Sequence, residues 1–363
     1  MKVDILSMQR IYNYGSFLQA YGLMKLIEER GHDVEFIDIE AGEHEGVRVE
    51  KGTVLADHKR TFDRYALKRF IFKIRAEQRN KMFEEQRRKY LKLPDEECTS
   101  IPCDLAVIGS DEVFNCNKAN PYGISLQLFG KIDCAKKVIS YAASCGYTDY
   151  TDVPEEYKIS IRDALNNLSL ISVRDKNTFE FVEKMTGIQA EYNLDPVLIY
   201  PFKKEVAQVE NKVLGIKKYM VVYAYKNRFK NVREIEIIKK FARSKGLKII
   251  SLGDSQYWAD DFMIPTPFEL LAYFKNAEYV LTDTFHGTIM AAKYHKKVAV
   301  VIRPSNENKL GDLISRIGLE KRRIESFSDF QKVIESECDY ENFEVILKKN
   351  RILTEKYLDK AGL

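Results

Sequence analysis

The sequence contains no apolar stretch long enough to cross a bilayer. Its first residues, 1–6, lack the apolar core and the small-residue cleavage site of a secretory signal. We therefore expect a chain that works in the cytoplasm. The net charge is only +4, so the composition gives no reason to expect nucleic acid as a partner, which would require clustered positive charge.

Cysteine and histidine are also sparse. The 6 cysteines form no C-x-x-C pair, and the 5 histidines do not stand at zinc-finger spacing. We therefore expect no metal site, and reduced thiols in a cytoplasmic chain. A complete G-x-G-x-x-G fingerprint for a dinucleotide is missing as well.

What the sequence does contain is a repeated alternation of apolar runs and helical patterns. The first unit predicts a strand at 3–8, a turn in which Ser16 is the N-cap, and a helix at 17–30. Later apolar runs likewise end in small or polar turns, which is typical of a parallel, doubly wound α/β sheet. A length of 363 residues exceeds one ordinary core and predicts two such domains.

Turns near residues 193–201 divide the chain. We expect a first Rossmann-like domain over residues 1–200 and a second over 201–335. The segment 336–363 predicts a C-terminal helix, which in this architecture could pack back across the cleft between the domains.

A basic helical segment at about 57–93 is inserted in the first domain. Lys and Arg recur there among apolar residues, with no Pro or Gly inside. One interpretation is a lid, or a surface that meets anionic lipid or saccharide, which would give peripheral contact with the inner face of the membrane. The other is a solvated helix whose apolar stripe is docked on the core. The two interpretations are compatible.

The most informative motif is Thr282-Asp283-Thr284-Phe285-His286-Gly287, which directly follows the apolar run Tyr279-Val280-Leu281. It predicts a strand end, a short turn and a helix that starts near Gly287. The free N–H groups of a helix start attract an anion, and His286 would stand beside them with a titratable ring. This combination indicates an enzyme that handles a phosphorylated or carboxylated small molecule. The alternative is a histidine that only caps or packs.

Other candidate residues follow predicted strands in the same way. Arg174 could grip a carboxylate or phosphate in bidentate fashion, or form a salt bridge with Asp175. Asp111 could act as a general base, and Asp195 could orient a neighbour. The further candidates for substrate binding are Asn13, Gly15, Ser16, Gly109, Ser110, Ser144, Asp283, Thr284, Gly287, Arg303 and Lys309. Each of them could instead be a turn, cap or surface residue.

Six segments together resemble the polysaccharide pyruvyl transferase family, and their order and spacing fit it from about Asn13 to Leu319. They are Asn13-Tyr14-Gly15-Ser16-Phe17-Leu18-Gln19-Ala20, Val107-Ile108-Gly109-Ser110-Asp111-Glu112-Val113-Phe114-Asn115, Ser140-Tyr141-Ala142-Ala143-Ser144, Ile171-Ser172-Val173-Arg174-Asp175, Leu194-Asp195-Pro196-Val197-Leu198, and Thr282-Asp283-Thr284-Phe285-His286-Gly287.

The resemblance implies two Rossmann-like domains that face a cleft, as in GT-B glycosyltransferases. It also implies transfer of the carboxyvinyl part of phosphoenolpyruvate to a sugar, which gives a pyruvyl ketal and free phosphate. Phosphoenolpyruvate would be a co-substrate, with no further cofactor, and the saccharide acceptor is often lipid-linked in such families. By the family pattern, Arg174 would hold the phosphate or carboxylate, and His286 would donate a proton or bind the phosphate.

The chain departs from the family pattern at two places. Many members carry an arginine two residues before the histidine, where this chain has Thr284. Some have Asn-Ser-Arg before the late helix, where this chain has Asn308-Lys309. The donor site would then draw its positive charge from Lys309 or Arg303, or the donor would differ.

Two other functions stay open at this point. One is a GT-B-type glycosyltransferase that uses a nucleotide sugar. The other is a saccharide- or anion-binding protein that kept the fold and lost the activity, since function belongs to the site and not to the fold.

Overall fold

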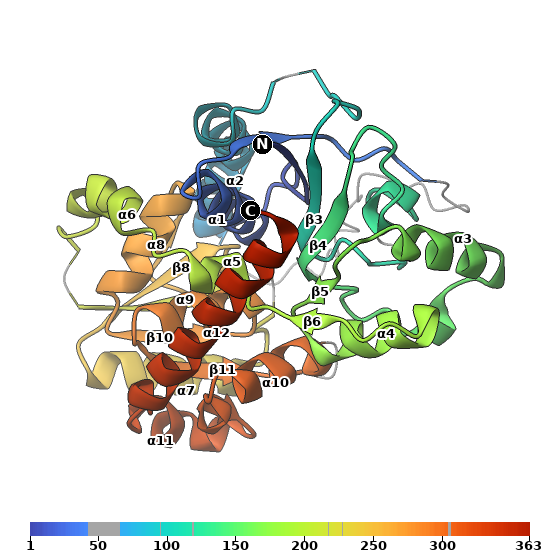
Figure 1. The fold of residues 1–363 in the computed structure, drawn as a ribbon. Coiled ribbons are helices and arrows are strands. Elements are labelled where there is room, and N and C mark those ends of the chain that lie inside the picture. The colour runs from blue at the N-terminus through green and yellow to red at the C-terminus, as the bar shows by residue number, and fades with distance from the viewer. Residues whose placement is uncertain (43–65, 95, 118–119, 217, 227, 304–305) are drawn as a thin grey trace.

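The computed structural model describes residues 1–42, 66–94, 96–117, 120–216, 218–226, 228–303 and 306–363. Within them the chain forms two sheets of six parallel strands each, with helices on their faces (Figure 1). Residues 57–65, where the inserted segment was expected to begin, lie outside the described residues.

The first sheet has the strand order of a doubly wound fold, with its earliest strand inside the sheet. In sheet order its strands are β2 (Asp33–Phe36), β1 (Lys2–Leu6), β3 (Leu105–Asp111), β4 (Val138–Ala143), β5 (Ser172–Val173) and β6 (Glu191–Tyr192). The helices that accompany it are α1 (Tyr14–Glu28), α3 (Glu155–Asn166), α4 (Lys176–Thr186) and α5 (Pro196–Ile199).

The second sheet repeats this arrangement. In sheet order its strands are β12 (Arg323–Ile324), β11 (Lys297–Val301), β10 (Tyr279–Thr282), β7 (Tyr219–Ala224), β8 (Lys248–Gly253) and β9 (Asp261–Met263). Its helices are α6 (Lys203–Val209), α7 (Val232–Ser244), α8 (Pro267–Asn276), α9 (Phe285–Lys293), α10 (Glu307–Arg316) and α11 (Phe330–Glu335). Short 3₁₀ turns occur at Leu126–Phe129, Tyr150–Asp152, Glu210–Lys212, Glu320–Arg322 and Phe327–Asp329.

Two expected helix starts are wrong by a few residues. The side chain of Asn13, and not that of Ser16, caps α1 by accepting a hydrogen bond from the backbone of Gly15. Helix α9 begins at Phe285 instead of Gly287, because the Thr284 hydroxyl accepts from the Gly287 N–H and caps the helix three residues earlier. Both shifts move a candidate site residue from the turn into the first turn of a helix.

One apolar core cluster continues from one domain into the other. It joins residues of β1 and α1 in the first domain to residues of α8, α9 and β10 in the second. At its centre Tyr21 of α1 packs edge-on against Phe268 of α8, with ring centroids 5.0 Å apart. The two domains are therefore packed against each other through apolar side chains.

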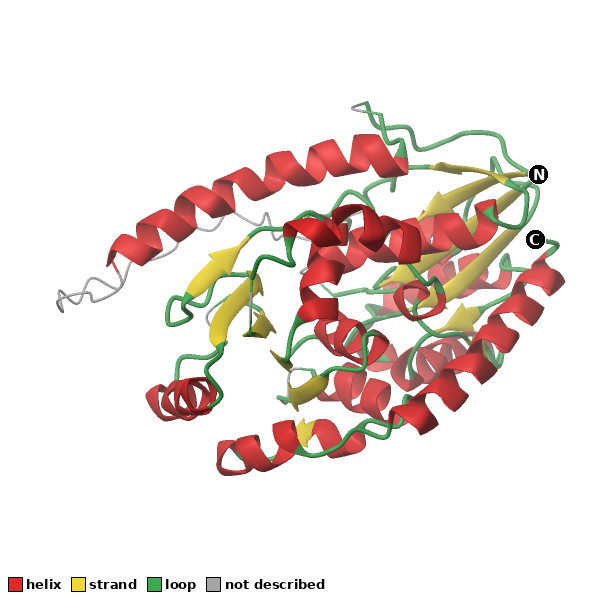
Figure 2. Cartoon of the chain, turned by 90° about the vertical axis from the view of Figure 1, so that its left-hand side faces the viewer, coloured by secondary structure: helices red, strands yellow, loops and turns green. Residues whose placement is uncertain are grey.

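The inserted helix α2 (Ala66–Gln86), continued by the π-helical turn η1 (Arg87–Leu91), contacts both domains. Near its start, Phe72 packs on Phe262 of the second sheet. Near its end, Phe83 packs on Tyr14 of α1, with ring centroids 4.9 Å apart. Figure 2 shows it as the long helix that begins at the grey trace and runs from one sheet to the other. The apolar residues Phe70, Ile71 and Ile74 of the same helix are exposed.

The last helix, α12 (Tyr340–Ala361), also contacts both domains. Glu344 near its start lies 2.8 Å from His295, which follows α9. Tyr357 near its end donates a 2.6 Å hydrogen bond to the carbonyl oxygen of Ser140 in β4. In Figure 1 this helix, in red, runs from α11 to the chain end beside the first sheet.

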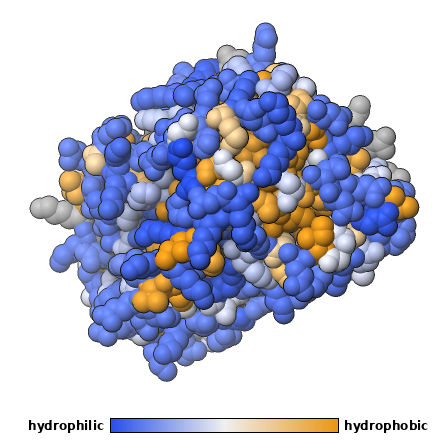
Figure 3. Space-filling view, in the orientation of Figure 1, coloured by the Kyte–Doolittle hydropathy of each residue, from blue (hydrophilic) through white to orange (hydrophobic). Residues whose placement is uncertain are grey.

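The face of the molecule that Figure 1 shows is mainly hydrophilic, with apolar patches between the polar side chains (Figure 3). One patch lies over α12, where Val345, Ile352 and Leu353 are exposed. Among the described residues, no helix combines the length and the apolar character needed to span a bilayer.

Candidate functional site

The carboxyl ends of the two sheets face each other. In a doubly wound sheet, ligands bind at the carboxyl ends of two neighbouring strands whose following connections run to opposite faces of the sheet. In the first sheet this point lies between β1 and β3, and in the second between β7 and β10. The segments after these strands hold Asn13, Asp111, Tyr225 and His286, so most of the predicted motifs converge on one place.

His286 lies in the first turn of α9 and reaches across to the first domain. Its Nε2 lies within hydrogen-bond distance of the amide nitrogen of Gln19 in α1 and 3.6 Å from Oδ2 of Asp195. Gln19 also donates to this same carboxylate oxygen at 2.9 Å. Two side chains of the first domain, Gln19 and Asp195, thus fix the imidazole, and the carboxylate of Asp195 places a negative charge beside it.

The carboxyl group of Asp195 is buried, with its side chain only 1% exposed. Burial acts to raise its pKa, but the interaction with His286 and the positive charges of His286 and Arg174 outweigh burial and lower the pKa below its ordinary value. Asp195 also caps the short helix α5 by accepting from the backbone of Val197. It is therefore an ionised group in a fixed position.

Arg174 lies behind this carboxylate and is almost closed to solvent, with 3% of its side chain exposed. Its guanidinium is 3.2 Å from Asp195, 3.8 Å from Asp111 and 4.0 Å from Asp175. It also lies over the ring of Phe285 at 4.5 Å. Burial acts to lower its pKa, but the surrounding carboxylates raise it, so the group stays charged.

Asp111, at the end of β3, accepts a 2.6 Å hydrogen bond from the hydroxyl of Ser16. Its side chain is 13% exposed, so a ligand can reach it. The next residue, Glu112, forms an ion pair with Lys309 of α10, which joins the first domain to the second. Burial acts to raise the pKa of Glu112, but the Lys309 ammonium lowers it.

A second group of charges surrounds Asp283, which is fully buried. The guanidinium of Arg228 lies 3.0 Å from its carboxylate. Arg303 donates to the carbonyl of Arg228 and lies over the ring of Phe229. Burial raises the pKa of Asp283, although Arg228 and Arg303 act against it. Lys309 and Arg303, the two predicted sources of positive charge, thus each have partners within the protein.

A hollow of about 170 Å³ opens between the domains beside His286. Of the predicted residues, Asn13, Thr284 and His286 line it, and Gly15 lies under the imidazole. The remaining lining residues are Tyr12, Tyr14, Arg79, Tyr223, Ala224, Tyr225, Gly253 and Asp254.

The other predicted residues are not among those that line this hollow. Gly109, Ser110 and Ser144 are all buried at the strand ends. The hydroxyl of Ser110 donates to the carbonyl of Ala142, and that of Ser144 accepts from the backbone of Gly146. Their hydrogen bonds serve the backbone of the first domain.

Besides the eight unpredicted residues that line the hollow, Asp195 and Gln19 contact His286 and were not among the candidate site residues. Asp195 had been noted only as a residue that could orient a neighbour. Gln19 stands four residues after Gly15, so both lie on one face of α1, a spacing that could have indicated it. Arg79 comes from the inserted helix, and no local motif marks it.

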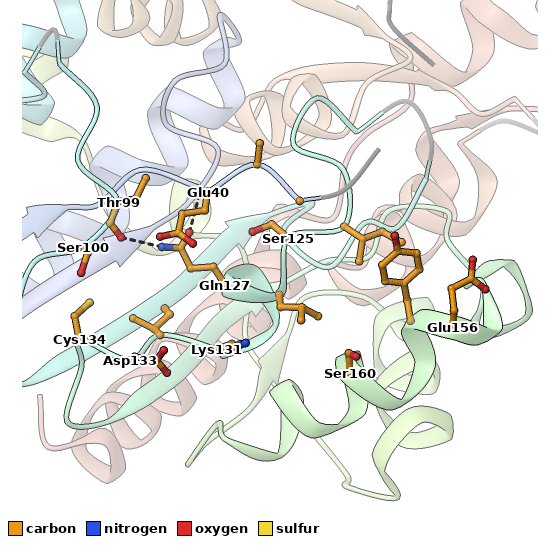
Figure 4. Close-up of a pocket in the computed structure, with 16 residues that line it drawn as sticks. Glu40, Thr99, Ser100, Ser125, Gln127, Lys131, Asp133, Cys134, Glu156 and Ser160 are labelled. Atoms are coloured by element: carbon orange, nitrogen blue, oxygen red, sulfur yellow. Dashed lines mark hydrogen bonds between the residues drawn. The ribbon is translucent and has the colours of Figure 1, made fainter. Parts of the chain in front are cut away.

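A larger hollow, about 720 Å³, lies elsewhere in the first domain (Figure 4). Glu40, Gln127 and Lys131 are among its lining residues, and none of the predicted site residues is. Its walls are held by polar contacts, since Gln127 accepts from the backbone of Glu40 and donates to the carbonyl of Thr99. In the described part of the chain, no three His, Cys, Asp or Glu side chains gather in a way that could hold a metal ion.

Comparison with known proteins places the chain in a family. A sequence profile of the polysaccharide pyruvyl transferase family matches residues 13–306. No curated protein matches the sequence. The structure of UDP-GlcNAc 2-epimerase from Neisseria meningitidis, bound to UDP-GlcNAc, is similar with a TM-score of 0.51 and 11% identity, over 99% of this chain and 100% of that one. The enzyme of the same name from Methanocaldococcus jannaschii gives a TM-score of 0.49 and 14% identity, over 98% and 100%.

The likeness to the Neisseria enzyme concerns the fold alone, because the sequences are so different. It confirms the expected architecture of two Rossmann-like domains that face a cleft in the GT-B manner.

Proposed function

Because this chain belongs to the polysaccharide pyruvyl transferase family, we propose that it moves the carboxyvinyl part of phosphoenolpyruvate onto a sugar of a bacterial surface polysaccharide. The products are a pyruvyl ketal and free phosphate. The observation that carries the proposal is the imidazole of His286, held by Gln19 and Asp195 at the edge of a hollow between the domains.

The reaction needs an acid, a base and a site for an anion. A sugar hydroxyl adds to C2 of phosphoenolpyruvate while C3 takes up a proton, and the C2–O bond to phosphate then breaks. A second hydroxyl closes the ketal at C2. Of the two protons that the hydroxyls lose, one balances the proton taken up by C3 and the other leaves with the phosphate.

In this proposal His286 delivers the proton to C3, or binds the departing phosphate. Asp195, ionised and 3.6 Å from Nε2, stabilises the protonated ring. Asp111 takes the proton of the attacking hydroxyl, and the hydrogen bond from Ser16 orients its carboxylate. Arg174, which the family pattern assigns to the donor anion, has its guanidinium between carboxylates. We propose that it positions Asp111 and Asp195.

The size of the hollow supports a small donor. Pockets for drug-sized ligands are about 300–1,000 Å³, whereas this one is about 170 Å³. Phosphoenolpyruvate is a small dianion and suits it better than a nucleotide sugar does. The acceptor sugar, lipid-linked or free, would approach from the open side of the cleft.

The test is release of phosphate from phosphoenolpyruvate in the presence of candidate saccharide acceptors. We expect release that depends on the acceptor and falls by about 100-fold or more in His286→Ala, since a general acid contributes about that much. His295→Asn is the matched control, because His295 follows the same helix but is exposed and pairs with Glu344. Turnover of a nucleotide sugar with no response to phosphoenolpyruvate would instead identify a glycosyltransferase. Undiminished phosphate release in His286→Ala would reject His286 as the acid, and saccharide binding by the wild type and by His286→Ala with no release in either would indicate a binding protein.

A further inference from the structure

The cations predicted for the donor site, Arg174, Arg303 and Lys309, have carboxylate partners within the protein, and none of them lines the hollow. Arg174 is 3% exposed and contacts three carboxylates. Lys309 is paired with Glu112, and the guanidinium of Arg303 lies 3.8 Å from Glu234. A dianionic donor therefore needs another cation at the hollow. Thr284, which lines the hollow, is neutral and supplies no such charge.

Arg79 meets this requirement. Among the described residues that line the hollow, its guanidinium is the one permanent positive charge. Its side chain is 30% exposed, ten times as much as that of Arg174, so a ligand can reach it. It lies on α2 between the part of the helix that packs on the second sheet, at Phe72, and the part that packs on α1, at Phe83. The inserted helix, which runs from one sheet to the other (Figure 2), thus brings Arg79 to the hollow.

Only part of the hydrogen-bonding capacity of the Arg79 guanidinium is used within the protein. One terminal nitrogen donates to Oδ1 of Asp254 at 3.0 Å, and within the described residues the structure gives Arg79 no other hydrogen-bond partner. Five N–H donors in a planar fork can hold a carboxylate on one edge and a phosphate or second carboxylate on another. Asp254 then orients the group and also competes with an incoming anion.

We propose that Arg79 binds an anionic group of phosphoenolpyruvate, and that the inserted helix thereby supplies the positive charge that Thr284 does not. This inference rests on the function proposed above. It makes the insertion part of the donor site, and it assigns the contact to a residue far from the family motifs in sequence.

Arg75 provides a matched control on the same helix. It pairs with Asp261 at 2.8 Å, also in the second domain, but it does not line the hollow. If the arginines of α2 serve only to dock the helix, changes at 75 and 79 should have similar effects. If Arg79 binds the donor, only the change at 79 should weaken donor binding.

The experiment is calorimetric titration of the full chain with phosphoenolpyruvate. For Arg79→Gln we expect affinity about 10-fold lower or more, since a hydrogen bond to a charged group contributes about 1.5–3 kcal/mol. Arg79→Lys should fall between wild type and Arg79→Gln. Arg75→Gln should stay within about 2-fold of wild type, because it changes docking alone. Asp254→Asn should bind more tightly than wild type, because it removes the competing carboxylate.

Two results would overturn the inference, and they differ. Wild-type binding that is weakened equally by Arg75→Gln and Arg79→Gln, or by neither, would reject the role of Arg79 and leave the proposed function standing. A wild-type chain that binds neither phosphoenolpyruvate nor inorganic phosphate would reject both. Melting curves of each variant show that the chain is folded in the titration.

Discussion

The imidazole of His286 lies directly over Gly15, which belongs to the other domain. A Cβ atom at residue 15 would come within 2.1 Å of Nδ1 and 2.4 Å of Cε1 of the ring. Gly15 and Gln19 are one helical turn apart on α1, so glycine leaves the space that the ring fills and glutamine supplies its contact. The first turn of α1 is therefore shaped by a residue of the second domain.

Gly15→Ala should accordingly displace the imidazole. We expect acceptor-dependent phosphate release to fall by about 100-fold, since a misplacement of about 1 Å can cost that much. Gly311→Ala is the control, because its Cβ would meet only the end of the Glu307 side chain. It should keep full activity and gain about 0.5–1 kcal/mol in free energy of unfolding from helix propensity. Equal activities of the two variants would contradict the assigned contact.

Asp195→Asn should lower both activity and stability. The change leaves Arg174 buried with one carboxylate fewer, for which we expect a loss of about 3 kcal/mol in free energy of unfolding at neutral pH. The folded-state pKa of Asp195 is lowered, so its ionised form stabilises the protein above the ordinary aspartate pKa of about 4. That contribution is lost as pH falls through the lower folded value.

Urea unfolding of wild type and Asp195→Asn as a function of pH checks this sign. The gap between the two proteins should be full at neutral pH and shrink below about pH 4. A gap that widened on acidification would show that Asp195 is not held ionised by His286 and Arg174.

The ion pair between Glu112 and Lys309 should couple the two domains. We expect Glu112→Gln and Lys309→Gln to be non-additive, with a coupling of about 1–2 kcal/mol in a double-mutant cycle of unfolding free energies. Lys2 and Glu35, 3.1 Å apart on the neighbouring strands β1 and β2 and both partly exposed, give the reference pair. That pair should show about 0.5 kcal/mol or less. Similar coupling in both cycles would mean that Glu112 and Lys309 behave as an ordinary surface pair.

Lys293, two turns after His286 on α9, should make stability depend on pH in the alkaline range. Burial lowers its pKa to about 7, although its ammonium donates to the carbonyl of Tyr200. Between about pH 7 and the ordinary lysine value of about 10.4 the unfolded chain binds the proton and the folded chain does not, so this residue makes stability rise with pH.

Lys293→Met should remove this dependence while filling a similar volume. Relative to wild type, the variant should lose stability as the pH is raised from about 7 to about 10, as followed by thermal unfolding in matched buffers. Lys296→Met offers a comparison just beyond the same helix, since burial lowers the pKa of Lys296 as well. A difference between wild type and Lys293→Met that does not change over this range would refute a nearly neutral Lys293.

Much of the fold could be predicted from the sequence because strands and turns are local. The apolar run before Thr282 and the polar turn after it placed His286 at a strand end, and the structure has it there. The N-cap of α1 was harder to predict, because Asn13 and Ser16 are both good capping residues. Only the path of the chain decides between them.

The partners within the site could not be predicted, because they come from distant segments. Gln19 contacts a histidine 267 positions away, and Asp195 lies between that histidine and Arg174. Arg79 reaches the hollow only because α2 packs on both domains. Local sequence patterns thus indicated which residues carry groups that could take part in binding or catalysis. The packing of distant segments decided which of these groups a ligand can reach.

The contacts of α12 have a consequence for how the chain is made. Domains generally fold as units in the order in which the ribosome releases them. Here Tyr357, bonded to the carbonyl of Ser140 and edge-on to Tyr141, covers a strand of the first sheet from a position beyond the whole second sheet. The newly made first half keeps an apolar face uncovered until the second half has been synthesised, and during that interval it is the part of the chain that a chaperone would bind.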